Sequence, residues 1–352
     1  MKYLVFSLIC IIGLILSACS HSTELTGGYL PENRTVVDYS VIYYIHADSD
    51  YLYHGPEGQP IRENSGVLAT AIEVAEQARS GEVFIFQQRP ERKLFGLFSR
   101  GSSRFYHYRY GLLINRYEYR HPDKKEDFLA TEAQLVNQYR AHNRSDNHQS
   151  FFLYFGHEIP SVNGTGYHRS IPGIDVNTIA LANGAQNFLL SDEDRFDLVL
   201  LSTCNNGTPA MAEFLMPFTY VMLASPQNLH LSHFDSSRMT LLEEEPGISS
   251  LQLGHAMAEQ TYQRLDTTVH STITIALYDF NDARTYINML TSLTAAKNVS
   301  DRSMQFKDNV DCAELLFLDP ESYSKGVVTW YKPSRFGRPS DQLIHSGWGC
   351  KP

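Results

Sequence analysis

Short runs that are apolar on both faces alternate with segments of helical spacing along most of this 352-residue chain. Strands that are buried on both faces belong to a sheet that helices cover on each side. The pattern therefore predicts an α/β fold with a mostly parallel sheet flanked by helices, with one hairpin inserted at residues 104–120. The expected strands are 40–48, 82–88, 150–157, 196–204, 219–225 and 271–279, and the expected helices are 65–81, 126–142, 176–189, 209–216, 248–265 and 282–297.

In sheets of this kind, functional residues gather at the carboxyl ends of the strands. A thiol attacks a carbonyl only as a thiolate, and a nearby His can activate it or protonate the leaving amine. The helix expected after Thr208 and the turn CNNG would place a helix N-terminus and backbone N–H groups near the sulfur, which favours an anion. The residues expected at the strand ends are Asp48, Gln87, His157, Cys204 and Ser225.

Two of these residues, Cys204 and His157, are the thiol and the imidazole that such chemistry needs, but each also has a purely structural interpretation. Taken alone, Cys204 is more simply a small buried residue, and His157 a hydrogen-bonded histidine at the rim of the sheet. Their places at the ends of two consecutive core strands favour the other interpretation, a catalytic Cys–His dyad.

The first residues of the chain have the pattern of a lipoprotein signal. Residues 1–18 are almost wholly apolar after Lys2, and the sequence Leu-Ser-Ala-Cys ends at Cys19. This tetrad resembles a bacterial lipobox, which predicts cleavage before Cys19, lipidation of its sulfur and a polar tether over residues 19–35. Ser20 favours a cell-envelope location at the outer membrane, facing the periplasm. The alternative is an ordinary signal peptide that happens to contain Cys.

Five cysteines remain to be assigned. Cys10 would leave with the signal and Cys19 would carry lipid. Three thiols on the exported side of a membrane can form one disulfide and leave one over. Cys312 and Cys350 both lie in the C-terminal segment and can pair, which would leave Cys204 outside the disulfide, but sequence does not determine connectivity.

Composition narrows the class of partner. Hydrophobic residues make up 43% of the chain, enough for a sizeable core, and the net charge is −10 without a basic run. Nucleic acid is therefore not an expected partner. The strand–helix pattern ends near residue 297, so we expect one domain over 36–297 and a C-terminal extension over 298–352 that packs on it.

Two further motifs contain metal-binding residue types. The spacing of His230, His233 and Asp235 in HLSHFD fits no common zinc pattern, and these residues are expected in a loop that can contact substrate. The sequence HADSD lacks the Gly and terminal Glu of an EF-hand loop. No metal and no cofactor are expected.

The order of these segments, with His after one strand and Cys after the next, resembles the caspase-like cysteine peptidases, and specifically the clostripain family. The resemblance covers roughly residues 36–297. The segments similar to that family are VIYYIHADSD, FFLYFGH, FDLVLLSTC, FTYVMLASP and STITIALYDFNDARTYINML.

The resemblance implies a caspase-like three-layer sandwich and an endopeptidase that hydrolyses peptides or proteins without a cofactor. It makes Cys204 the nucleophile and His157 the general acid and base. The backbone N–H groups of Cys204 and Glu158 would hold the oxyanion.

Two positions depart from the family's pattern. Glu158 stands where the family usually has Gly, and Ser202 where its peptidases usually carry an Asp that binds Arg or Lys of the substrate. A hydroxyl does not pair with a guanidinium as a carboxylate does. The expected substrate pocket contains Ser202, Asp48 and Ser225, and the side-chain preference at the cleavage position stays open.

These departures motivate a second class of function, a catalytically inactive lipoprotein that keeps the fold and binds a peptide or partner protein in the same cleft. A third is a thiol hydrolase acting on cell-wall peptides. The chain order argues against the third, because the common cell-wall thiol peptidases are expected to have Cys before His.

Overall fold

The computed structural model describes most of the chain beyond residue 35. The described residues are 36–46, 52–54, 60–89, 92–94, 98–100, 103–121, 127–160, 174, 176–229, 234–298, 309–316, 324–334 and 342–350. The expected signal peptide, Cys19, the tether, Asp48, His230 and His233 lie outside these ranges.

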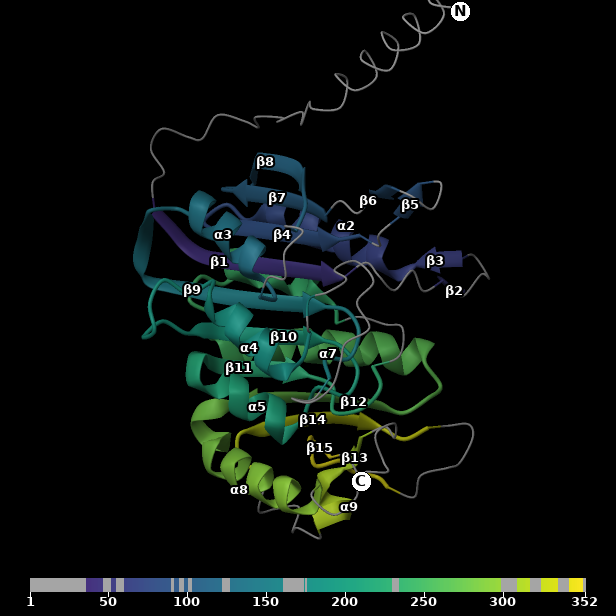
Figure 1. Ribbon diagram of the computed structural model, residues 1–352. Helices are drawn as coiled ribbons and strands as arrows, with labels where there is room; N and C mark the ends of the chain where they lie inside the picture. The colour runs from purple at the N-terminus through teal and green to yellow at the C-terminus, as the bar shows by residue number, and fades with distance from the viewer. Residues whose placement is uncertain are drawn as a thin grey trace, which may run out of the picture.

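A nine-stranded sheet forms the centre of the molecule, in the order β14-β12-β11-β10-β9-β1-β4-β7-β8 (Figure 1). Its middle strands β11, β10, β9, β1 and β4 are parallel, and the strands toward both edges are antiparallel. The strands are β1 (Val36–His46), β4 (Glu82–Gln88), β7 (Ser103–Arg109), β8 (Leu112–Tyr119), β9 (Asn143–Phe155), β10 (Phe196–Ser202), β11 (Thr219–Ala224), β12 (Ile273–Asp279) and β14 (Val327–Lys332).

Helices cover both faces of the sheet, as the sequence predicts. One face packs against α3 (Ala130–Tyr139), α4 (Thr178–Gln186), α5 (Pro209–Leu215) and α8 (Phe280–Asn298). The other packs against α2 (Glu63–Gln77), η2 (Ser236–Thr240), α6 (Leu241–Glu244) and α7 (Ser250–Thr268). The three-layer α/β sandwich is thereby confirmed.

The shorter elements lie between these layers or at their ends. They are η1 (Met216–Phe218), α9 (Cys312–Leu316) and the paired strands β2 (Leu52–His54) with β3 (Pro60–Arg62), β5 (Arg92–Leu94) with β6 (Phe98–Arg100), and β13 (Val310–Asp311) with β15 (Gly349–Cys350).

The alternation of side chains along each central strand divides the core in two. In β1, Ile42 and Tyr44 face α3 and α4, while Tyr43 and Ile45 face the layer of α2 and α7. The ring of Tyr44 stacks on that of Tyr154 in β9, with centroids 5.6 Å apart. Complete burial of an aliphatic side chain such as Ile45 stabilises the fold by about 1.5–3 kcal/mol.

The C-terminal segment adds a strand to the main sheet, which its sequence pattern does not predict. β14 pairs antiparallel with β12 over Ile273–Tyr278 and forms the edge of the sheet. Side chains of β14 are only partly buried, so the segment lacks the strongly apolar run that marks the inner strands.

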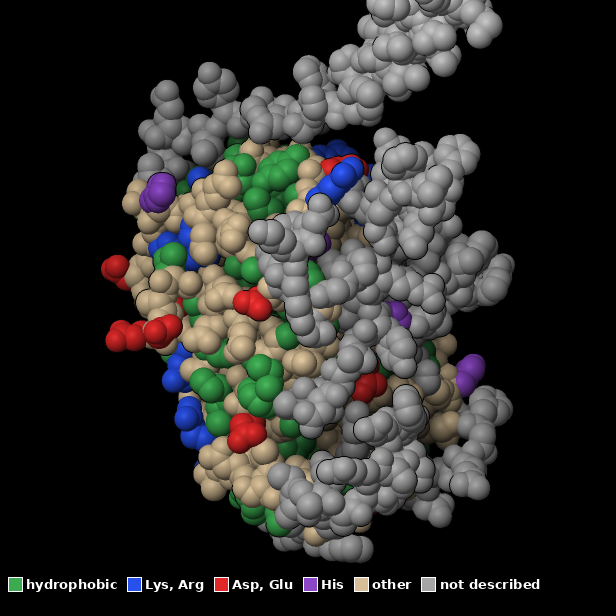
Figure 2. All heavy atoms as spheres, viewed as in Figure 1, with side chains coloured by type: hydrophobic (Ala, Val, Ile, Leu, Met, Phe, Trp, Pro, Cys, Tyr) green, Lys and Arg blue, Asp and Glu red, His purple; other side chains and the backbone are tan. Residues whose placement is uncertain are grey.

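Two observations concern the outside of the molecule. Among the described residues on the face shown in Figure 2, acidic and basic side chains lie scattered among polar and apolar ones. Within the described ranges, no helix has both the length and the apolar character needed to cross a bilayer.

Candidate active site

Two neighbouring parallel strands deliver the predicted dyad. The register pairs Phe155 of β9 with Ser202 of β10. The N–H of Gly156 donates to the Ser202 carbonyl at 3.2 Å and extends the ladder past the last pair. His157 and Cys204 each stand two positions beyond that pair, so they leave the same edge of the sheet side by side. Both residues are half-buried, and Cys204 is outside the disulfide.

Asn206 fastens the loop after Cys204 to the loop after His157. Its side-chain amide donates to the Ile159 carbonyl at 2.8 Å, and its Oδ1 accepts from the Ile159 N–H at 2.9 Å. The hydroxyl of Thr203 donates to the same Oδ1 at 2.6 Å. This bidentate contact sets the spacing of the two loops that carry the dyad.

Asn205 makes a second connection between these loops. Its Nδ2 donates to Glu158 Oε2 at 2.8 Å and to Asn228 Oδ1 at 3.2 Å. Its backbone is left-handed, with φ of 57°, and its N–H donates to the Gln227 carbonyl at 2.9 Å. The Glu158 carboxylate is therefore held against the loop that carries Cys204. The proposed oxyanion roles of the Glu158 and Cys204 N–H groups stay predictions.

Two predicted pocket residues lie inside the fold. Ser202 is 1% exposed, and its hydroxyl accepts from the Phe234 N–H at 2.9 Å. Ser225 is 0% exposed, and its hydroxyl lies 2.8 Å from the Thr274 carbonyl and 2.7 Å from that of Gln227. Neither hydroxyl reaches the surface in this conformation, and both fasten loops at the strand ends. Their assignment to a substrate pocket finds no support in these contacts.

The helix expected after Thr208 is present. Helix α5 begins at Pro209, and the Thr208 hydroxyl caps it by accepting from the Met211 N–H at 3.2 Å. Proline at the first helical position suits this start, because its missing N–H would have no partner inside the helix.

Asp235, in the loop before η2, is half-buried and caps that helix rather than projecting into solvent. Its carboxylate accepts from the Ser237 N–H at 3.0 Å and from Gln260 Nε2 at 2.8 Å. Burial is the largest single influence on the pKa of Asp235 and raises it. The hydrogen bonds from Ser237 and Gln260 and the charge of Arg264 together outweigh burial and hold the pKa below its ordinary value. Asp235 is thus a helix cap, and the metal or substrate contacts considered for the HLSHFD loop gain no support from it.

Sequence reasoning missed the roles of the two asparagines after Cys204. The CNNG sequence suggests a flexible turn, yet Asn205 is 6% and Asn206 3% exposed, and both are tied to neighbouring loops. Asn is the residue that most readily takes a left-handed backbone after Gly, so NN after a strand is a weak local signal for Asn205. Apart from Thr203, the partners of both side chains are tens of residues away in sequence, where no local pattern points to them.

The sequence matches no protein-family model and no curated protein. Solved structures are similar in fold. A secreted C11 cysteine protease from Bacteroides thetaiotaomicron, iotapain, has 11% identity and a TM-score of 0.58 over 90% of this chain and 94% of its own.

An inactive zymogen of a C11 protease from Parabacteroides distasonis has 12% identity and a TM-score of 0.53, covering 92% of this chain and 94% of its own. A secreted C11 cysteine protease from Bacteroides thetaiotaomicron in complex with an irreversible peptide inhibitor has 12% identity and a TM-score of 0.52, covering 90% of this chain and 89% of its own. The chain therefore has the caspase-like fold of the C11, or clostripain-family, cysteine proteases.

Proposed function

We propose that this chain is a cysteine endopeptidase that uses Cys204 and His157. The observation that carries the proposal is the register of β9 and β10, which brings the two residues to the same edge of the sheet, two positions past a paired Phe155 and Ser202. The C11 fold supports it, because C11 structures with this fold are described as cysteine proteases. Asn206 adds support, since a dyad needs its two loops held at a constant spacing.

The reaction follows from the chemistry of the two side chains. The Cys204 thiolate attacks the carbonyl carbon of the scissile bond, and a C–S bond forms while the carbonyl oxygen takes the negative charge. The N–H groups of Glu158 and Cys204 stabilise that oxyanion. The C–N bond then breaks as His157 gives its proton to the departing amine.

The acyl-enzyme is released by water. His157 takes a proton from the water, the oxygen attacks the thioester carbon to form the new C–O bond, and the C–S bond breaks to return the Cys204 thiolate beside the protonated His157. The proposal does not include a preference for Arg or Lys, because Ser202 supplies no carboxylate beneath the cleavage position.

The first test uses purified residues 20–352 with a thiol-reactive, peptide-directed probe and a mixed peptide library. Cys204→Ala and His157→Ala should each lower labelling and cleavage by at least about 10³-fold, because nucleophile and base act as one unit. His142→Ala, at an exposed histidine, is the matched control and should retain wild-type rates.

A folded wild-type protein that neither reacts with the probe nor cleaves the library, even after limited proteolysis, would contradict the enzyme proposal. That result would support the inactive lipoprotein that binds a peptide or partner. Peptides cleaved by the library screen would at the same time define the preferred side chain at the cleavage position.

We also propose that lipid on Cys19 anchors the chain to the outer membrane, with the folded domain in the periplasm. The sequence Leu-Ser-Ala-Cys supports this proposal. Cys19→Ala should move the protein from the membrane fraction to the soluble fraction and abolish metabolic labelling with a fatty-acid analogue, whereas Cys204→Ala should leave both unchanged. Retention of labelled protein in the Cys19→Ala membrane fraction would exclude this anchor.

A further inference from the structure

The C-terminal segment is hydrogen-bonded to the loop that carries Cys204. We name residues 203–207 the nucleophile loop, and residues 309–312 with 346–350 the brace. Asn309 Nδ2 donates to the Asn205 carbonyl at 2.8 Å. The N–H of Gly349 donates to the Gly207 carbonyl at 2.8 Å. The brace thus binds the loop carbonyls one and three positions after Cys204.

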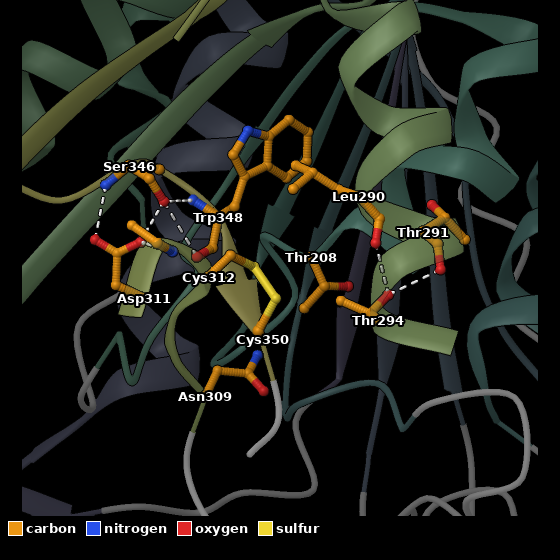
Figure 3. Close-up of a disulfide and its surroundings, with 12 residues drawn as sticks. Thr208, Leu290, Thr291, Thr294, Asn309, Asp311, Cys312, Ser346, Trp348 and Cys350 are labelled. Carbon is orange, nitrogen blue, oxygen red and sulfur yellow. Dashed lines mark hydrogen bonds between the residues drawn. A yellow bond between two sulfur atoms is a disulfide. The ribbon is translucent and has the colours of Figure 1, made fainter. Parts of the chain in front are cut away.

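The brace is internally cross-linked. Strands β13 and β15 pair Val310 with Cys350 and Asp311 with Gly349, and the Cys312–Cys350 disulfide joins the same two segments. Figure 3 shows the Cys312–Cys350 disulfide, with Asn309 on one side of it, Trp348 on the other and Thr208 of the neighbouring loop beside it. This pairing was left open by the sequence, and the disulfide is confirmed.

A buried carboxylate completes the brace. Asp311 is 2% exposed and accepts from the N–H and hydroxyl of Ser346, from the Ala313 N–H and from Gln342 Nε2. The Cys312 N–H donates to the Trp348 carbonyl at 2.9 Å. Each half of the brace therefore depends on the other.

Glycines of the loop and of the brace are closely packed by their surroundings. A Cβ at Gly207 would lie 2.5 Å from Tyr278 Oη and 2.6 Å from the Pro226 nitrogen, and a Cβ at Gly349 would collide with the Pro226 carbonyl. Trp348 is fully buried, and its ring packs on that of Tyr278 with centroids 4.5 Å apart. Gly207 of the loop and Gly349 of the brace therefore both lie close against Pro226.

From these contacts we propose that the brace positions Cys204 for attack, with Asn309 as a positioning residue, and that reduction of Cys312–Cys350 lowers peptidase activity. The inference rests on the proposed function. Its physical basis is the left-handed Asn205, whose N–H is bonded to the Gln227 carbonyl and whose carbonyl is bonded to Asn309. Loss of the bonds to the Asn205 and Gly207 carbonyls lets that backbone relax and moves the sulfur.

The reduction step is an ordinary thiol–disulfide exchange. A dithiol such as dithiothreitol gives two electrons and two protons, the Cys312–Cys350 bond breaks into two thiols, and the dithiol closes to its own disulfide. Reductants usually raise the activity of a thiol peptidase by keeping the nucleophile reduced. In this protein dithiothreitol would keep Cys204 reduced, which raises activity, and would also break the Cys312–Cys350 disulfide, which lowers activity.

The first experiment compares Asn309→Ala with Asn137→Ala in the full protein. The control also removes an amide that donates to a backbone carbonyl, that of Asn187, away from the site. Because misplacement of a reacting group by about 1 Å costs up to about 100-fold in rate, we expect kcat of Asn309→Ala to fall by about 10–100-fold with KM unchanged. An unchanged kcat, or an equal fall in the control, would overturn the positioning role.

The second experiment titrates wild type and Cys312→Ser/Cys350→Ser with dithiothreitol. Wild-type kcat should fall, once Cys204 is fully reduced, to the level of the double variant, and the double variant should not respond further. A wild-type rate that only rises with dithiothreitol would overturn the redox part. Because this titration uses folded wild type, it remains informative if the double variant folds poorly.

Hydrogen exchange separates this inference from the proposed function. The Asn205 and Gly207 amides are bonded to the Gln227 and Ser225 carbonyls, and their protection should fall in Asn309→Ala and on reduction. If wild type cleaves no peptide but protection falls, the brace is supported and the peptidase proposal fails. If wild type is active and both kcat and protection are unchanged in the variants, the brace fails and the peptidase proposal stands.

Discussion

Asn206 illustrates how a single side chain can define the site. Its amide satisfies both the N–H and the carbonyl of Ile159, a residue that is only 2% exposed, and so replaces a stretch of backbone pairing where the strands have ended. An aspartate would keep the acceptor and lose the donor, while an alanine would lose both. The side-chain amide of Asn206 is therefore required, because an aspartate of similar size cannot make both hydrogen bonds.

Asn206→Ala should lower both stability and activity. The substitution leaves the buried N–H and carbonyl of Ile159 without partners, each at about 1–3 kcal/mol, so the free energy of unfolding should fall by about 2–6 kcal/mol. Urea denaturation measures the first effect and peptide hydrolysis the second. Asn183→Ala, at an exposed position of α4, is the control and should stay within about 0.5 kcal/mol of wild type.

His345 makes the brace sensitive to acid. Its Nδ1 accepts from the Gly347 N–H at 3.0 Å, lies 3.9 Å from Asp311 Oδ2, and its ring packs on Tyr331. Burial lowers the pKa of His345, and the nearby Asp311 carboxylate opposes this only in part. The folded protein therefore binds this proton less readily than the unfolded chain, whose histidine pKa is about 6.5.

The sign of this effect sets the expected pH profile. Stability should be retained above about pH 6.5 and fall as the pH drops below that value toward the lowered pKa of the folded state. His345→Asn, which keeps an acceptor near the Gly347 N–H and cannot be protonated, should make the profile less steep below about pH 6.5. Parallel urea-midpoint profiles for the two proteins would contradict the assignment to His345.

At the scale of elements, the inner strands were the most predictable. Residues 82–88 were predicted as a strand and form β4 with those bounds, because continuous apolar residues can only be buried between two layers. Residues 104–120 form the hairpin of β7 and β8, whose turn at Tyr110 and Gly111 has positive φ angles of 53° and 76°. Local composition carries enough information for both.

Elements that depend on distant partners were not predictable in this way. β9 begins at Asn143, seven residues before the predicted start of the strand at residue 150, because Asn143 and Arg144 pair with the start of β1 across a bulge. β14 joins the sheet through β12, although its own sequence alternates little. Helical spacing and apolar runs report burial along one segment, and they carry no information about which strand lies next to it.

Helix α7 has a start that can be tested by itself. The Ser249 hydroxyl accepts from the Gln252 N–H at 3.2 Å, and Gln252 Oε1 accepts from the Ser249 N–H at 3.1 Å, which forms a capping box. Ser249→Ala should reduce the free energy of unfolding by about 1 kcal/mol. Ser249→Thr keeps the cap and should be nearly neutral, and equal losses in both variants would show that the hydroxyl is not the cause.

For the molecule as a whole, the disulfide is expected to be a main source of stability. It closes a loop between residues separated by 38 positions, which in the chain-entropy model is worth about 4 kcal/mol. For a domain of this size that corresponds to a fall in Tm of about 6 °C on reduction. Calorimetry with and without dithiothreitol measures it, and Cys312→Ser/Cys350→Ser should be insensitive to the reductant. A reductant-dependent shift of equal size in that variant would rule out the disulfide as its source.

The candidate site was predictable only in part. Cys204 and His157 were predicted because strand ends and reactive residue types are both visible in the sequence, and the register of β9 and β10 brings both to one edge of the sheet. Asn309 could not be found, because its bond to Asn205 spans 104 residues and depends on the folded C-terminal segment. Candidate reactive residues can be recognised from local sequence patterns, whereas the residues that hold them in place come from segments far away in the sequence.

That separation has a consequence for the timing of synthesis. A chain emerges from its amino end at about 5–20 residues per second, so Asn309 follows Asn205 by about 5–20 s. During that interval the nascent domain holds Cys204 but not the contacts that fix its loop. In the mechanism that we propose, Cys204 is therefore fully positioned only after the C-terminal segment has emerged.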